Sequence, residues 1–218
     1  MPKKTLAPQQ ERSRESLRKL LKAAAEVLGQ HGVEGATIPR IARHAGLTPG
    51  AVYRRFHDKD ALLEQVILGI LERQLERTRN GMTPEAAAQI PLPVFVEQVI
   101  NGMVLSYRMN APLLRALRSF VRGRAHTPFW KKASRLEVQS FELVLELFLT
   151  HRAEIRHPDP RAAIAMGLTM AISTLFEVVV MPLDLGPMKN FIPKDDLGLR
   201  RELTLAFLRY LGVEQEKG

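Results

Sequence analysis

The chain has 218 residues, 45% of them hydrophobic, so it can build a core without disulfides or bound metal. It contains no cysteine, which excludes disulfides, thiolate zinc sites and a cysteine nucleophile, and indicates a reducing compartment such as the cytoplasm. The net charge of +9 favours a polyanionic partner, and Lys and Arg outnumber Asp and Glu by 12 to 5 through Lys59 but by only 20 to 18 afterwards.

The first twelve residues are expected to form a flexible basic arm. They hold two prolines and several basic residues, including Lys3 and Lys4, with little apolar material, and they show no apolar run of the kind found in signal peptides. From about Ser13, apolar residues recur at helical spacing and predict a first helix that ends at Gly32.

Two short helices and a longer one are predicted next. Thr37 is placed to cap the second helix, and Gly46 ends it. Thr48 is placed to cap the third, with Pro49 at its first position, which is a strong helix-start signal. Asp58 is placed to cap a long fourth helix.

The rest of the chain also predicts helices, at about 92–108, 111–125, 128–155, 160–180 and 195–211, and no segment alternates convincingly at period two. We therefore expect an all-α protein of about nine helices. The stretch 162–180 is long enough to test as a membrane span, but Thr169, Ser173 and Glu177 interrupt it, so we expect no membrane partner.

Small residues recur four apart in that stretch, at Ala163, Gly167 and Ala171. They lie on one helical face, where small side chains let another helix approach closely. We predict that this face is a homodimer interface; the alternative is an internal core helix.

Residues 37 to 56 have the pattern of a helix-turn-helix. Ala42 lets two short helices cross closely, Gly46 permits a sharp turn, and Ile41 and Val52 are among the apolar residues that seal the contact. Any tight helical hairpin could use the same glycine, so the pattern by itself is only moderately specific for DNA binding.

The longer stretch TIPRIARHAGLTPGAVYRRFHDKDALL, from Thr37 to Leu63, closely resembles the N-terminal signature of the tetracycline-repressor (TetR) family. The resemblance covers residues 13 to 65 by motif, and the remainder matches in length and helical layout. Pro39 is unusual within the second helix, and Arg54 with Arg55 is more basic than the family pattern. The resemblance implies a dimeric, all-helical repressor that releases DNA when a small ligand enters its C-terminal domain.

We expect the DNA contacts to come from the second and third helices and the start of the fourth. Free amides at helix N-termini favour binding of phosphate. Gly50 and Ala51 keep the leading turn of the third helix narrow enough to enter a major groove. Tyr53 can donate a hydrogen bond from its hydroxyl to the DNA backbone, or it packs half-buried against the first helix. The predicted DNA-binding residues are Thr37, Arg40, Arg43, Thr48, Pro49, Gly50, Ala51, Tyr53, Arg54, Arg55 and Lys59.

Lys59 lies in the first turn of the fourth helix, where a cation opposes the helix dipole and is mildly destabilising without an anion. A DNA phosphate would resolve that conflict. The four arginines of the set are candidates to contact phosphate or guanine, or they are solvated charges. Lys3 and Lys4 are candidates for an arm that follows the minor groove.

Eight basic residues between 108 and 135 run without an intervening acid, and Arg115, Arg118 and Arg122 share a helical face. The run is either a solvated surface or the entrance for an anionic amphipathic effector, such as a fatty acid or an acyl thioester. The predicted pocket residues are Phe95, Met103, Tyr107, Arg118, Phe120, Phe141, Met166 and Met170, each of which could instead be ordinary core.

Catalysis finds little support in the sequence. The six histidines show no metal-ligand spacing, and there is neither a phosphate-binding glycine loop nor a Gly-x-Ser-x-Gly elbow. We expect no enzyme activity, catalytic residue, metal or cofactor.

The expected domains are an arm (1–12), a helix-turn-helix domain (13–58) and a regulatory and dimerisation domain (59–218). The predicted function is a homodimeric repressor released from a palindromic double-stranded DNA operator by a small-molecule effector. The alternatives are an architectural DNA-binding dimer without an effector, and a helical lipid-binding protein or enzyme that does not bind DNA.

Overall fold

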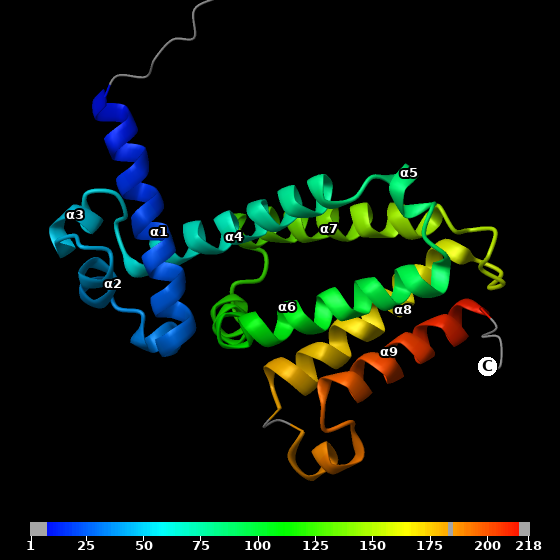
Figure 1. Cartoon of the computed structure of the whole chain (residues 1–218). Coiled ribbons are helices and arrows are strands. Elements are labelled where there is room, and N and C mark those ends of the chain that lie inside the picture. The colour runs from blue at the N-terminus through cyan, green and yellow to red at the C-terminus, as the bar shows by residue number, and fades with distance from the viewer. Residues whose placement is uncertain (1–7, 183–184, 214–218) are drawn as a thin grey trace, which may run out of the picture. The chain divides into compact units, whose positions relative to one another are not determined.

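A computed structural model of the chain describes residues 8–182 and 185–213 (Figure 1). Within these ranges every regular element is helical and no strand occurs, which confirms the predicted fold class. The elements are α1 (Pro8–Gly35), α2 (Ile38–His44), α3 (Pro49–Tyr53), α4 (Lys59–Gly81), α5 (Pro84–Ala87), α6 (Leu92–Val121), α7 (Pro128–Leu149), α8 (Pro160–Leu175) with a π-helical extension (Phe176–Val180), a 3-10 helix (Gly186–Phe191) and α9 (Asp196–Leu211).

The chain divides into two compact units. The head unit comprises Met1–Leu71 and Pro112–Ala133, and the second unit comprises Glu72–Ala111 and Ser134–Gly218. The head unit therefore contains the predicted helix-turn-helix together with the start of α4, the end of α6 and the start of α7.

The head unit has a core built on α1. Leu20, Ala24 and Leu28 recur at helical spacing and are completely buried, as are Ile41 of α2 and Leu62 of α4. Helix α1 packs on α2, and α2 packs on α3. The buried apolar face of α1 therefore holds the two short helices in place.

Several helix boundaries differ from the predictions. Helix α1 begins at Pro8, before the predicted start at Ser13, and continues to Gly35 across a kink at Gly32, where φ is +66°. The predicted break between two helices near residue 110 is wrong, because α6 runs unbroken through Pro112. A proline inside a helix costs one backbone hydrogen bond, and the buried residues Ala116 and Phe120 show that packing continues beyond it.

The second unit is held by a core of apolar side chains in which α8 and α9 lie side by side (Figure 1). Their contact is tight at Gly167, where an added Cβ would lie 2.1 Å from Cε2 of Phe207. Glycine is required there because the Phe207 ring occupies the space that a side chain would fill.

This contact corrects the predicted dimer interface. Ala163, Gly167 and Ala171 do share a face of α8, but that face is buried inside the chain and packs against α9. Side chains without exposed surface cannot contact a second copy, so the interface prediction is wrong for these three residues. The alternative, an internal core helix, describes them correctly.

One described helical stretch, Pro160–Val180, is long and apolar enough to cross a bilayer by length and composition, with a mean hydropathy of 2.0. The core helix of a globular protein meets the same criterion. Its buried small-residue face in contact with α9 fits that second description.

Candidate nucleic-acid interface

Two threonines begin the helices of the helix-turn-helix. The Thr37 hydroxyl accepts a hydrogen bond from the Arg40 amide (3.4 Å), and the Thr48 hydroxyl accepts one from the Ala51 amide (3.2 Å). Each helix also has a proline in its first turn, where the missing N–H removes no helical bond. Both predicted caps are confirmed, and both hydroxyls are engaged in capping.

The turn between α2 and α3 is fixed by glycine and by buried side chains. Gly46 has a φ of +68°, a conformation that an L side chain rarely adopts. The next amide, that of Leu47, donates to the Ala42 carbonyl at 2.8 Å, while Ile41 and Val52 are completely buried. These contacts set the angle between the two helices, as the sequence pattern predicted.

The outer face of α3 is narrow at its start and polar at its end. Pro49 and Gly50 are exposed, and a Cβ added to Gly50 would have no atom within 4 Å. Tyr53 is 55% exposed, and the Arg54 side chain next to it is also exposed. The first turn can therefore approach a surface closely, and the last turn presents a hydroxyl and a cation.

The four arginines predicted to contact DNA fall into two pairs. Arg40 donates through Nη1 to the Gly35 carbonyl at 2.8 Å, and Arg55 donates to the Ser13 carbonyl at 3.1 Å and to its hydroxyl at 3.3 Å. For the side chains of Arg43 and Arg54, no polar partner is found among the described residues. The second pair is thus better placed to bind an external anion.

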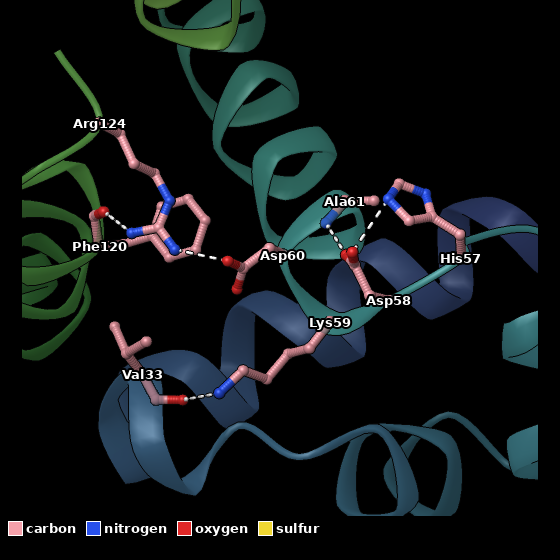
Figure 2. A network of polar contacts seen from close by, with 8 residues as sticks. All are labelled: Val33, His57, Asp58, Lys59, Asp60, Ala61, Phe120 and Arg124. Atoms are coloured by element: carbon pink, nitrogen blue, oxygen red, sulfur yellow. Dashed lines mark hydrogen bonds and ion pairs between the residues drawn. The ribbon is translucent and has the colours of Figure 1, made fainter. Parts of the chain in front are cut away.

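Lys59 has a partner inside the chain (Figure 2). Its Nζ donates to the Val33 carbonyl at 3.2 Å, in the last turn of α1. Carbonyl groups at a helix C-terminus carry partial negative charge, so they supply the compensation that the sequence analysis assigned to a phosphate. A DNA contact by Lys59 remains a prediction, without the electrostatic conflict that motivated it.

The start of α4 is also tied to the segment that follows α6 (Figure 2). Arg124 binds the Asp60 carboxylate at 2.6 Å, donates to the Phe120 carbonyl and lies over the Phe120 ring at 3.8 Å from its centroid. Asp58 caps α4 as predicted, accepting from the Ala61 amide at 2.7 Å. Sequence analysis missed Asp60 and Arg124 as partners, because 64 residues separate them and no local pattern joins them.

The eight predicted pocket residues are not gathered into one site within either unit. Arg118 and Phe120 belong to the head unit and the other six to the second unit. Met166 and Met170 are 51% and 41% exposed, so they are not part of the buried core, and their place in a pocket stays a prediction. Their helix is apolar on nearly every side, and its sequence gave no signal for which face is buried.

Four of the predicted pocket residues do belong to the core of the second unit. Phe95 is buried, with its ring 4.8 Å from that of Phe148, whereas Met103, Tyr107 and Phe141 are partly buried against the core. These three side chains are candidates to line a ligand site, because each retains some exposed surface beside apolar neighbours.

The Glu137 carboxylate influences the ionisation of Tyr107. Burial raises the pKa of Tyr107, and the negative charge of Glu137 raises it further. The surrounding protein also raises the pKa of Glu137 itself, although its side chain reaches solvent. Sequence analysis missed Glu137 because it emphasised the acid-free run that ends just before this residue.

Two comparisons of sequence bear on these residues. Residues 20–66, which contain α2 and α3, match the model of a family described as bacterial regulatory proteins, tetR family. The HTH-type transcriptional regulator BetI of Escherichia coli (strain K12 / DH10B) is 26% identical over 161 residues, a match that covers 73% of this chain and 79% of that protein.

Solved structures share the fold at lower identity. A TetR-family transcriptional regulator from Mesorhizobium loti superposes with a TM-score of 0.68 at 16% identity, covering 92% of this chain and 97% of that one. The transcriptional regulator FadR from Bacillus subtilis, solved with stearoyl-CoA, gives a TM-score of 0.61 at 17% identity and covers 89% and 96% of the two chains. The resemblance extends through the second unit as well as the head.

Proposed function

Because this chain belongs to the TetR family of bacterial transcriptional regulators, we propose that it is a repressor that binds a palindromic operator as a homodimer and leaves it when a small molecule binds the second unit. The observation that carries the proposal is the outer face of α3. Its first turn has free space at Gly50, and its last turn exposes Tyr53 and Arg54.

These features match what a major groove requires of a helix. The groove is about 12 Å wide and admits a helix whose leading residues are small, while hydroxyl and guanidinium groups bind phosphates and base edges. Arg43 and Arg54 are the cations proposed to contact DNA, with Arg40 and Arg55 holding α1.

The test begins with selection of genomic fragments bound by the full chain, followed by a change at Gly50. Gly50→Leu adds a side chain where the structure has free space, so the protein should fold normally, while the leucine should obstruct entry into the groove and weaken fragment binding by at least about tenfold. Unchanged affinity would overturn the proposed role of α3.

Gly102→Leu is the matched control. Gly102 is also exposed on a helix, and a Cβ there would likewise meet no atom within 4 Å, but it lies on α6 in the second unit. The control should bind DNA like the wild-type protein. Failure of the wild-type chain to retain any fragment would favour the lipid-binding protein or enzyme alternative.

For the homodimer we propose the outer faces of α8 and α9, in place of the buried face of α8. Met166 and Met170 are exposed on α8, and Tyr210 is 39% exposed on α9. Exposed apolar side chains of this kind are costly to leave in water and suit a self-complementary contact.

Charge placed on this surface should separate the two copies. Met166→Glu with Met170→Glu is expected to give monomers in sedimentation velocity, whereas Met109→Glu, at a methionine that is 76% exposed on α6, should not. Because a palindrome is read by two heads held about one helical turn apart, the monomeric variant should also bind DNA weakly. A double variant that stays dimeric would move the interface elsewhere.

The effector is proposed to bind beside Met103, Tyr107 and Phe141. FadR of Bacillus subtilis was solved with stearoyl-CoA, which supports the predicted anionic amphipath, whereas the Glu137 carboxylate beside Tyr107 disfavours an anionic group at that point. Alkyl chains of equal length ending in carboxylate or in trimethylammonium would compare the two charges.

Thermodynamic linkage between effector binding and DNA binding gives this comparison a quantitative criterion. A true effector that weakens DNA affinity by some factor must bind DNA-bound protein more weakly by the same factor. Reciprocal coupling with the carboxylate alone would support the anionic amphipath, and coupling with the ammonium alone would reject it. If neither couples, the architectural DNA-binding alternative gains support.

A further inference from the structure

The first turns of α1 are fastened to the end of α3. Arg55 follows α3 by two residues, and its guanidinium holds both the carbonyl and the hydroxyl of Ser13. In Figure 1 the N-terminal end of α1 extends beyond the pair α2 and α3. The residues around Ser13 therefore lie at the edge of the candidate nucleic-acid interface.

Two arginines flank this fastening point. At about 100° per residue, Arg12 and Arg14 project to either side of Ser13, whereas Lys22 projects about 180° away from it. The side chains of Arg12 and Arg14 are exposed and have no ion pair or hydrogen bond among the described residues.

Glu15 lies three residues after Arg12 and Glu11 three residues before Arg14, but among the described residues of α1 only the neighbouring lysines form ion pairs with carboxylates of this helix. Lys19 pairs with Glu15 at 3.0 Å, which lowers the pKa of Glu15, and Lys22 lies 3.8 Å from Glu26. Arg12 and Arg14 thus carry positive charge that no ion pair among the described residues neutralises, next to the end of α3.

We propose that the first turns of α1 make a second contact with the DNA backbone beside the groove that α3 enters, with Arg12 and Arg14 binding phosphates. Arg55 is a positioning residue that holds these turns in place through Ser13. Guanidinium groups suit this task because their paired N–H donors match phosphate oxygens. The inference rests on the proposed function and enlarges its DNA surface to an element outside the helix-turn-helix.

Salt dependence provides the test, and it needs no knowledge of the operator. The probe is a mixed-sequence DNA duplex about three helical turns long, titrated with the full chain between 50 and 200 mM salt. Each lost phosphate contact lowers the slope of log affinity against log salt by about 0.9, so Arg12→Gln with Arg14→Gln should lower it by about 1.8. Over that fourfold range in salt, the loss of affinity should then be about tenfold smaller than in the wild-type protein.

Two variants control for effects of charge and of folding. Lys22→Gln removes one positive charge from the opposite face of α1 and should leave the slope unchanged. Replacing Arg12 and Arg14 with lysine keeps both charges and should restore most of the slope. Wild-type binding with a slope that Arg12→Gln and Arg14→Gln do not alter would overturn this inference alone, whereas no duplex binding by the wild-type chain would overturn the proposed function.

The role of Arg55 is tested by combination. If Arg55 acts by holding Ser13, then Arg55→Met should lower the slope in the wild-type background and have little further effect once Arg12 and Arg14 are glutamine. If the two effects add fully, Arg55 contacts phosphate itself and the positioning role is overturned.

Discussion

The head unit and the second unit differ in what places their helices. In the head unit, side chains bind the backbone or side chains of other segments: Arg40 with Gly35, His44 with Glu26, Arg55 with Ser13, Lys59 with Val33, and Arg124 with Asp60. The second unit also has polar contacts between distant segments, such as Arg108 with Asp196, but its long helices meet over a core that contains aromatic rings, with Phe148 4.8 Å from Phe95 and 5.4 Å from Phe207 between ring centroids.

Helix length explains the difference. Helix α2 has seven residues and α3 has five, and α3 buries only Val52. Helices this short are marginal in water, so caps and directional polar contacts must define where they lie. Helix α8, in contrast, buries six residues and is placed by packing. The comparison teaches that changes in the head should alter DNA binding more than stability, and that changes in the second-unit core should do the reverse.

The largest effect is expected at the contact between α8 and α9. Phe207→Ala empties the space against which Gly167 packs, and large-to-small changes of this kind cost about 3–5 kcal/mol of unfolding free energy. Urea denaturation monitored by circular dichroism would measure the loss. A cost below about 1 kcal/mol would mean that α8 and α9 close the cavity and that packing there is less specific than the structure indicates.

An intermediate effect is expected at Arg124, whose side chain is 27% exposed. Arg124→Met should cost about 1 kcal/mol, and Asp60→Asn should add little to it, because the two side chains form one ion pair. The same variants should weaken binding to a DNA duplex measurably, since the start of α4 loses one of its anchors. Loss of stability without any change in DNA affinity would contradict the comparison.

The smallest effect is expected at Glu137, and it depends on pH. Its raised pKa means that the folded chain holds the proton more tightly than the unfolded chain, so ionisation lowers stability as pH rises above the ordinary 4.5. Glu137→Gln should therefore raise Tm slightly at neutral pH and leave it unchanged below pH 4.5, with Glu142→Gln as a control for lost charge. The gain should stay under about 1 kcal/mol because the carboxylate reaches solvent.

The same variant has a spectroscopic signature. Without the Glu137 carboxylate, the pKa of Tyr107 should fall toward its ordinary value of 10.0, which ultraviolet absorbance of the phenolate would detect. An unchanged tyrosine titration would mean that Glu137 does not interact with Tyr107, and it would weaken the argument for an effector site beside them.

Sequence reasoning succeeded where structure is decided locally. A threonine or an aspartate caps a helix through an amide three residues ahead, so Thr37, Thr48 and Asp58 could be read directly from the chain. The turn at Gly46 is local in the same way. These elements account for most of the candidate DNA-binding surface.

It failed where partners are distant or where a helix has no polar side. The bond from Lys59 to Val33 spans 26 residues, so a phosphate was the only partner that the local pattern suggested. On α8, small and large apolar residues cover nearly every face, and which of them meet α9 depends on the position of Phe207. Long-range packing therefore buries Gly167 and leaves Met166 exposed, the reverse of what the sequence analysis expected.

The turn at Gly46 restricts the chirality of the residue at this position but not the size of its side chain. Its φ of +68° lies in the region that D-amino acids favour, and a Cβ built there would have no atom within 4 Å. In a semisynthetic protein, a D-residue at this position should fit without strain and should restrict the unfolded chain more than glycine does. A fluorophore attached to a D-lysine at this position would then report DNA binding next to the turn between α2 and α3, without replacing a side chain that forms contacts in the protein.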